Sequence, residues 1–83
     1  MFAISIDIEV TQKQMEDLHD VLGRFGFFPA IGGMFLSESK DMVGLFLAIN
    51  ELKAIPWFAE KVQEVKAFRV ENMSDFTEII KRG

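Results

Sequence analysis

Few side chains in this sequence carry chemistry, and Asp7 is the most informative of them. It stands near the end of an alternating run, residues 2–10, on the polar side that it shares with Ser5. A carboxylate at a strand end can act as a general base or bind a divalent ion, and a two-fold axis beside it would double the charge. A solvated strand residue is the alternative interpretation, and the pattern alone leaves both open.

The basic side chains and the single histidine give weaker signals. Five basic residues could form a local phosphate-binding patch or be scattered surface charge: Arg24, Lys66, Arg69, Lys81 and Arg82. His19 borders the apolar face of a predicted helix, where a half-buried packing role is more common than acid catalysis. Gly32 and Gly33 predict a turn. The residues around them do not match the pattern of a glycine-rich phosphate-binding loop. The acidic residues are too dispersed to form a recognisable metal-binding set.

Composition limits the kinds of protein this can be. The 83 residues make one domain, residues 1–83, and the absence of cysteine with a single histidine excludes disulfides and zinc knuckles. A net charge of −4 argues against a broad cationic surface for duplex nucleic acid. Apolar residues make up 49% of the chain, with six glycines besides, which is more hydrophobic surface than so small a core hides easily. We therefore expect self-association.

The elements that must position Asp7 can be predicted from periodicity and caps. Alternation places Phe2, Ile4, Ile6, Ile8 and Val10 on one face of a first strand. Thr11 and Gln14 form a capping box for the helix that follows, and Gly26 occupies the position of a left-handed C-cap. The first unit is therefore a strand followed by a helix.

The rest of the chain predicts a hairpin and a second helix-strand unit. Residues 27–31 and 34–36 flank the glycine turn. A helix follows over about residues 40–53, with Ser37 and Ser39 as candidate N-caps and its apolar stripe at Met42, Leu45, Phe46, Ile49 and Leu52. Pro56 begins a short helical piece to about residue 64, residues 65–71 form the last strand, and Ser74 caps a terminal helix whose Phe76, Ile79 and Ile80 share one side.

This order is that of an α+β, ferredoxin-like β-α-β-β-α-β fold with an extra short helix after the second main helix and a C-terminal helix. We expect the helices to cover the face of Phe2. The other face offers Ala3, Ser5 and Asp7 and, from the last strand, Ala67 and Arg69 or Lys66, depending on register. The small residues Ala3, Ser5 and Ala67 allow close approach of another sheet and predict a two-fold dimer interface. Without a basic leader or an apolar run of about 20 residues, the protein is expected to be cytoplasmic, with no membrane partner.

Several segments carry a family resemblance, in order along nearly the whole chain. They are Met1-Phe2-Ala3-Ile4-Ser5-Ile6-Asp7-Ile8, Leu22-Gly23-Arg24-Phe25-Gly26-Phe27, Asp41-Met42-Val43-Gly44-Leu45-Phe46 and Ala67-Phe68-Arg69-Val70-Glu71 with Ser74-Asp75-Phe76-Thr77. The sequence resembles the virulence-associated protein D (VapD) family of bacterial toxin–antitoxin and plasmid-borne proteins. The segment from Ala67 to Thr77 is the most specific part.

The resemblance implies a ferredoxin-like fold related to the small CRISPR-associated nuclease-like proteins of spacer acquisition. It also implies a homodimeric endoribonuclease that cleaves single-stranded RNA or mRNA, with an antitoxin protein as a further partner. The family carboxylate at the end of the first strand falls on Asp7, and a divalent metal such as Mg²⁺ bound by Asp7 is the candidate cofactor. Arg69 is then expected to stabilise charge at the reacting phosphate, with Arg24 and Lys66 binding RNA.

Three positions depart from the family pattern, and two of them lose a hydroxyl group. Where relatives usually have Gln-Gly-Ser-x-Tyr, this sequence has Ile31-Gly32-Gly33-Met34-Phe35, so Gly33 and Phe35 replace the serine and the tyrosine. RNA cleavage needs an activated 2′-oxygen and a stabilised leaving oxygen, and two hydroxyl donors for the second task are missing. A weakened nuclease is one expectation, and a non-catalytic homodimeric module that binds a partner protein is the alternative.

Overall fold

In the part of the chain that the structure describes, four strands and four helices follow one another in the order that the sequence predicts. The computed structural model describes residues 1–30, 32–39, 41–71 and 77–82. In chain order the elements are β1 (Phe2–Ile8), α1 (Gln12–Arg24), β2 (Phe28–Pro29), β3 (Met34–Ser37), α2 (Met42–Ala54), α3 (Phe58–Lys61), β4 (Val62–Arg69) and α4 (Thr77–Arg82). The predicted α+β class and element order are confirmed.

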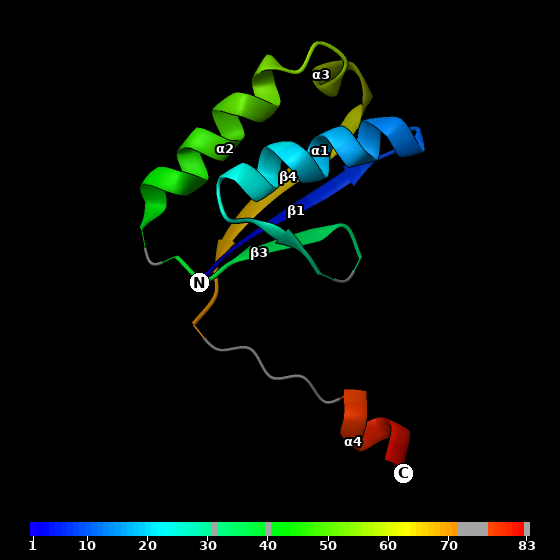
Figure 1. Ribbon diagram of the computed structural model, residues 1–83, viewed down its shortest axis with the longest axis vertical. Helices are drawn as coiled ribbons and strands as arrows, with labels where there is room; N and C mark the ends of the chain where they lie inside the picture. The colour runs from blue at the N-terminus through cyan, green and yellow to red at the C-terminus, as the bar shows by residue number, and fades with distance from the viewer. Residues whose placement is uncertain (31, 40, 72–76, 83) are drawn as a thin grey trace.

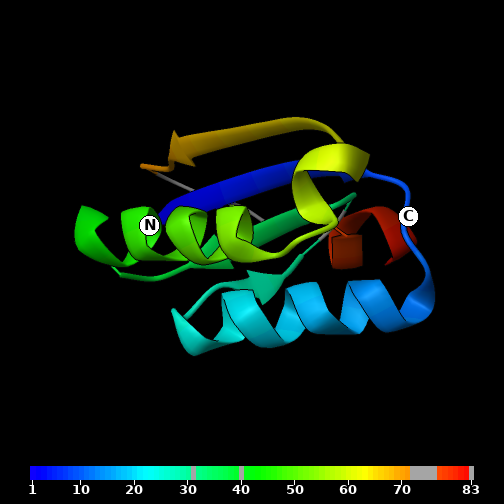
Figure 2. The same ribbon diagram turned by 90° about the horizontal axis from the view of Figure 1, so that it is seen from above.

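The strands form one antiparallel sheet in the order β2-β3-β1-β4. β1 is central and pairs with β3 on one side and β4 on the other, which is the ferredoxin-like arrangement. Both long helices, α1 and α2, lie on the same side of this sheet (Figures 1 and 2). The sheet therefore has one face covered by helices and one face without them.

The core lies between the sheet and the two helices. β1 contributes Phe2, Ile4 and Ile6, all buried, from the face that alternation predicts. Facing residues come from α1, α2, α3 and the hairpin, and they complete one cluster: Leu18, Val21, Leu22, Phe27, Phe35, Leu45, Ala48, Leu52 and Phe58. This cluster fixes how the helices sit on the sheet, because the interior is close-packed.

Both ends of α1 follow the sequence closely. Thr11 Oγ1 accepts a hydrogen bond from Gln14 N (3.2 Å), and Gln14 Oε1 accepts one from Thr11 N (3.1 Å), so the predicted capping box is formed. At the other end Gly26 has φ +81°, and the amide of Phe27 donates to Leu22 O (3.0 Å). This is the left-handed helix ending that favours glycine.

The second helix differs from its prediction in two ways. Its N-cap is Asp41, whose Oδ1 accepts a hydrogen bond from Val43 N (2.9 Å), so neither Ser37 nor Ser39 caps it. Its buried side consists of Leu45, Ala48 and Leu52, while Met42 and Phe46 are exposed. The predicted apolar face was too wide. The first two turns of α2 are apolar on every side, so the spacing of apolar residues does not show which of them face the core.

The end of the chain also differs in its boundaries. The short helix α3 ends at Lys61, and β4 already begins at Val62, so residues 62–64 belong to the strand and not to the helix. A terminal helix is present as α4, which lies apart from the sheet (Figure 1), while Ser74 and Phe76 lie outside the described residues. In the described ranges, none of the helices combines the length and apolarity needed to traverse a lipid bilayer.

The capping box makes a stability prediction. Thr11→Ala removes the oxygen that accepts from Gln14 N and should lower the free energy of unfolding by about 1 kcal/mol. Urea denaturation followed by circular dichroism measures this. Gln12→Ala, at an exposed position of the same helical turn, is the control and should change stability by less than about 0.5 kcal/mol. Equal losses of unfolding free energy in the two variants would show that the capping box contributes nothing to stability.

Candidate functional site at the end of the first strand

Asp7 lies near the end of β1 on the face of the sheet that the helices leave uncovered. It is exposed, and its register partner on β4 is Glu64. A β-bulge follows at once, because Ile8 pairs with Val62 and one residue of β4 is left without a partner. Bulges of this kind bend a strand and redirect its side chains, and they are frequent beside active sites.

A second carboxylate and a cation stand beside Asp7 on this face. Glu64 lies directly across from it, and Lys66, opposite Ser5, is the next residue of β4 on the same face. Lys66 Nζ is 2.9 Å from Glu64 Oε1, and both side chains are more than half exposed. Sequence analysis missed Glu64, since it assigned residue 64 to a helix. Strand alternation back from Lys66 was the signal that could have found it.

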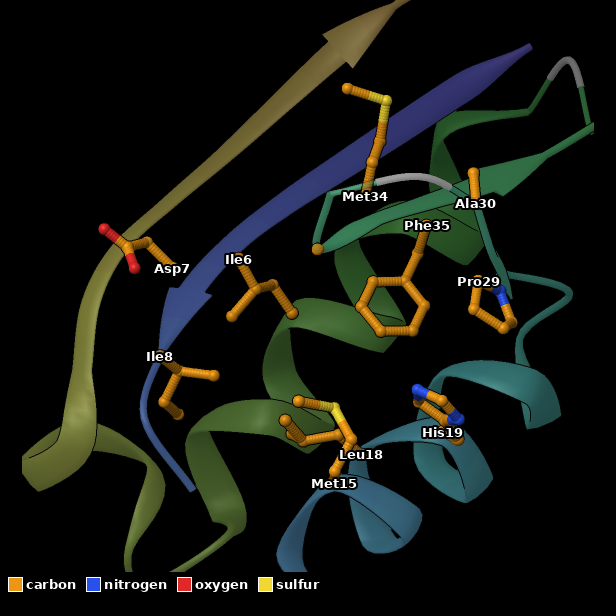
Figure 3. A pocket seen from close by; sticks show the side chains of 11 residues that line it. Ile6, Asp7, Ile8, Met15, Leu18, His19, Pro29, Ala30, Met34 and Phe35 are labelled. Carbon is orange, nitrogen blue, oxygen red and sulfur yellow. The ribbon is translucent and has the colours of Figure 1, made fainter. Parts of the chain in front are cut away.

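A hollow of about 360 Å³ opens on the other side of the end of β1. Its walls come from β1, α1 and the β2–β3 hairpin (Figure 3): Ile6, Asp7, Ile8, Met15, Leu18, His19, Pro29, Ala30, Gly33, Met34 and Phe35. Asp7 is at its rim and points away from the other side chains (Figure 3). The hollow and the carboxylate therefore share the end of β1, on opposite faces.

His19 provides one wall of the hollow. Its imidazole meets the ring of Phe35 edge to face, with ring centroids 5.4 Å apart and an interplanar angle of 75°. Phe35 is buried while His19 is exposed, so the buried ring holds an imidazole that remains accessible. The sequence had favoured packing over chemistry for His19, and it did not predict that His19 and Asp7 would line one hollow.

The hollow exists because the hairpin ends early against β1. β3 pairs with β1 only from Phe2 to Ser5, and one further hydrogen bond runs from Ile6 N to Gly33 O (3.0 Å). Gly33 has φ +76°, and a Cβ built on it would lie 2.7 Å from Ile6 O. Only glycine allows the turn to approach β1 so closely, and Asp7 and Ile8 extend beyond it.

The structure does not bring the other predicted site residues to this end. Arg69 pairs with Phe2, five residues from Asp7 and therefore roughly 16 Å away along the strand. Its Nε lies 3.6 Å from Glu71 Oε1. Arg24 is the last residue of α1, which returns from the Asp7 end toward the start of β1 (Figure 1). Of the three predicted basic residues, Lys66 alone lies near Asp7 in one chain.

The predicted small-residue face needs a correction. Ala67 pairs with Ile4 and thus shares the helix-covered face, so the expectation that it lies with Ala3 and Ser5 is wrong. The reason is register: shifting β4 by one residue exchanges its two faces. Lys66 and Phe68 occupy the uncovered face in place of Ala67 and Arg69.

The register instead defines an apolar row across all four strands of the uncovered face. Phe28 pairs with Leu36, Leu36 with Ala3, and Ala3 with Phe68. The two phenylalanines at the ends are 62% and 44% exposed, whereas Ala3 in the middle is buried by its neighbours. The row therefore has bulky, exposed ends and a low centre, and it lies at the opposite end of β1 from Asp7.

A divalent ion would find two carboxylates here. Mg²⁺ is commonly held by one or two carboxylates together with water, and Asp7 and Glu64 fit that requirement as direct cross-strand neighbours. No group of three or more metal-ligating side chains occurs in the part of the chain that the structure describes. Such an ion, when bound, would add positive charge against a phosphate.

The fold and site define a ferredoxin-like α+β protein with a carboxylate at the end of its central strand, and sequence comparison gives its family. The chain is 40% identical to the endoribonuclease VapD homolog of Neisseria gonorrhoeae, over 98% of this chain and 99% of the relative. It is 39% identical to endoribonuclease VapD of Haemophilus influenzae (84% and 77%) and 33% identical to that of Helicobacter pylori (98% and 99%). No family model matches. The chain belongs to the VapD endoribonuclease family.

The glycine turn makes a prediction about the serine that the family resemblance assigns to position 33. Gly33→Ser should destabilise the fold by about 2–4 kcal/mol, because the new Cβ would press on Ile6 O in a conformation that already disfavours side chains. Gly32→Ser is a matched control: Gly32 also has positive φ (+63°) but open space around it. Gly32→Ser should lower the free energy of unfolding by only about 1 kcal/mol. Equal losses in thermal unfolding would mean that the close contact with Ile6 is unimportant.

Proposed function

We propose that this chain is an endoribonuclease that cleaves single-stranded RNA, with Asp7 as its general base. The observation that carries the proposal is an exposed carboxylate at the end of the central strand, beside a bulge and a hollow, in a chain of the VapD family. A general base must be accessible to its substrate, and Asp7 meets that condition. An exposed site at the end of a strand suits an unpaired RNA strand better than a duplex.

The proposed reaction is an internal transesterification. The Asp7 carboxylate removes the proton of a ribose 2′-hydroxyl, and the 2′-oxygen attacks the adjacent phosphorus as the bond to the 5′-oxygen breaks. The products are a 2′,3′-cyclic phosphate and a 5′-hydroxyl, which takes its proton from water. Lys66 offsets the charge that develops on the phosphoryl oxygens. Its ion pair with Glu64 is exposed and therefore weak, so exchanging Glu64 for a phosphate costs little.

We also propose that this chain cleaves RNA more slowly than an enzyme that has the serine and the tyrosine of the family pattern. With glycine and phenylalanine at positions 33 and 35, the hairpin offers no hydroxyl to the leaving oxygen. Arg69 and Arg24 lie toward the other end of β1 in the same chain, where they suit a phosphate further along the RNA better than the reacting one. Among the described residues of one chain, Lys66 is then the cation that stands at the reacting phosphate.

The proposal predicts that Asp7→Asn will lower the cleavage rate of an unstructured RNA by about 10²- to 10⁴-fold. The asparagine amide is close in size to the carboxylate but cannot accept the proton. Asp20→Asn makes the same chemical change at an exposed position of α1 and should leave the rate unchanged. Gel analysis of 5′-labelled RNA, with and without Mg²⁺, measures both. Equal cleavage by the two variants would remove Asp7 from the mechanism.

We also propose that two copies of the chain pair through the apolar row of Phe28, Leu36, Ala3 and Phe68. A two-fold axis between Ala3 and Phe68 would place the bulky end of each copy against the low centre of the other, since an isologous interface uses the same surface twice. It would also cover two exposed phenylalanines that a soluble monomer would leave in water. Binding to an antitoxin protein stays a prediction.

The pairing proposal predicts that Phe68→Lys will convert the dimer to a monomer in light scattering coupled to size exclusion. Charge in a paired apolar surface is costly unless it finds a partner. Val43→Lys makes a similar change at an exposed apolar position of α2 and should leave the dimer intact. A dimer that survives Phe68→Lys but is lost in Val43→Lys would place the interface on α2 instead.

A further inference from the structure

We infer that the hollow beside Asp7 is a pocket for a single nucleobase of the RNA, with His19 as the wall against which the base lies. This inference rests on the proposed function and deepens it, because it adds a base-recognition subsite to the phosphate chemistry of Asp7. Its support comes from the position, size and lining of the hollow.

Position links the hollow to the proposed reaction. Asp7 is a member of its rim, while Ile6 and Ile8 on either side of Asp7 in the chain form its floor and wall. A ribose whose 2′-hydroxyl reaches Asp7 would stand at the end of β1. The base attached to that ribose can then turn into the hollow, past the point where β3 stops pairing with β1.

Size favours one planar ring system over a longer segment of polymer. The volume of about 360 Å³ lies at the lower end of the roughly 300–1,000 Å³ range of small-molecule pockets. The floor is fixed, since Ile6 and Leu18 are buried members of the core cluster. The hollow is therefore a built feature of the packing between β1, α1 and the hairpin, and not a gap between loops.

The lining favours an uncharged, flat ligand. Apolar side chains such as Met15 and Ile8 make up most of it, and no lysine or arginine occurs among the described residues that line it. Among the described residues of the lining, the carboxylate of Asp7 points away from the hollow (Figure 3) and leaves its interior without a cation to bind a phosphate. An uncharged base needs no such cation, and its ring edge can still meet polar groups at the rim.

His19 is the residue best placed to distinguish bases. His19 is exposed and lines the hollow, and its edge-to-face contact with the buried Phe35 favours one orientation of the imidazole. Single-stranded RNA is recognised by proteins largely through unstacked bases that lie against aromatic rings and histidine. The ring face of His19 is thus a stacking surface that the buried core holds in place.

Methionine methyl NMR tests the pocket without relying on catalysis. The probe is a 2′-O-methylated hexanucleotide, which lacks the attacking hydroxyl, added to uniformly ¹³C-methyl-methionine-labelled protein. Met15 lines the hollow and should shift through the ring current of the bound base, whereas Met42, exposed on α2, should not. An abasic hexanucleotide of the same length should leave Met15 unshifted, because it offers the backbone without a base.

Variants of His19 test the wall itself. His19→Ala should weaken binding of the same hexanucleotide roughly tenfold in fluorescence anisotropy, which is within the effect of removing one base-stacking ring. His19→Phe keeps a flat ring and should restore most of the affinity. Gln12→Ala, on the same helix but outside the hollow, should bind as the unaltered protein does.

The outcomes separate the two proposals. RNA cleavage that depends on Asp7, together with an unshifted Met15, would overturn the base pocket and leave the nuclease standing. Equal shifts from the abasic and complete hexanucleotides would also overturn it, since the backbone would then be the ligand. Shifts at Met15 that appear on raising the protein concentration without RNA would assign the hollow to a second copy of the chain and overturn the inference. Binding at Met15 without any cleavage would support the pocket and contradict the nuclease.

Discussion

The approach of Gly33 to the backbone of Ile6 determines the form of this end of the molecule. Among the described residues, the hydrogen bond from Ile6 N to Gly33 O is the last backbone hydrogen bond between the hairpin and β1, and the absence of a Cβ at residue 33 lets the turn close there. Beyond this point the central strand continues without β3 beside it. The hollow and the accessible wall of His19 follow from that early ending, whereas Asp7 is exposed because it lies on the face that the helices leave uncovered. A hairpin of one more residue pair would fill the space in which the proposed base lies.

A second constraint is the register between β1 and β4, which divides the site between two faces of the sheet. The pairing of Asp7 with Glu64 places two carboxylates and Lys66 on the uncovered face, and the bulge at Ile8 then alters the pairing so that the strand turns away. The hollow lies on the helix-covered face of the same strand end. A nucleotide that used both would have to wrap round the edge of β1, with its sugar at the carboxylate and its base on the helix side. This arrangement requires a flexible, unpaired strand.

Sequence reasoning succeeded where a pattern is local and failed where it depends on pairing. Alternation in β1, the capping box of Thr11 and the glycine ending of α1 are short-range features, and the structure has all three. The face of Ala67 was wrong because register between strands 60 residues apart in sequence cannot be read from either strand alone. The closeness of His19 to the end of β1 was missed for a similar reason. It depends on how far α1 overlaps the hairpin, which side-chain packing decides.

Charge explains why the proposed base pocket would matter more in this chain than in a basic nuclease. The chain carries nine basic and thirteen acidic residues, and Lys13, Lys66 and Arg69 each lie within 4 Å of a carboxylate oxygen. Affinity for RNA that came from phosphate neutralisation would therefore be small and easily screened by salt. Burial of one base in an apolar hollow does not depend on net charge, and stacking of a single base accounts for roughly 1–3 kcal/mol in single-strand-binding proteins. An acidic chain of this family can hold its substrate if the base, and not the backbone, supplies most of the binding energy.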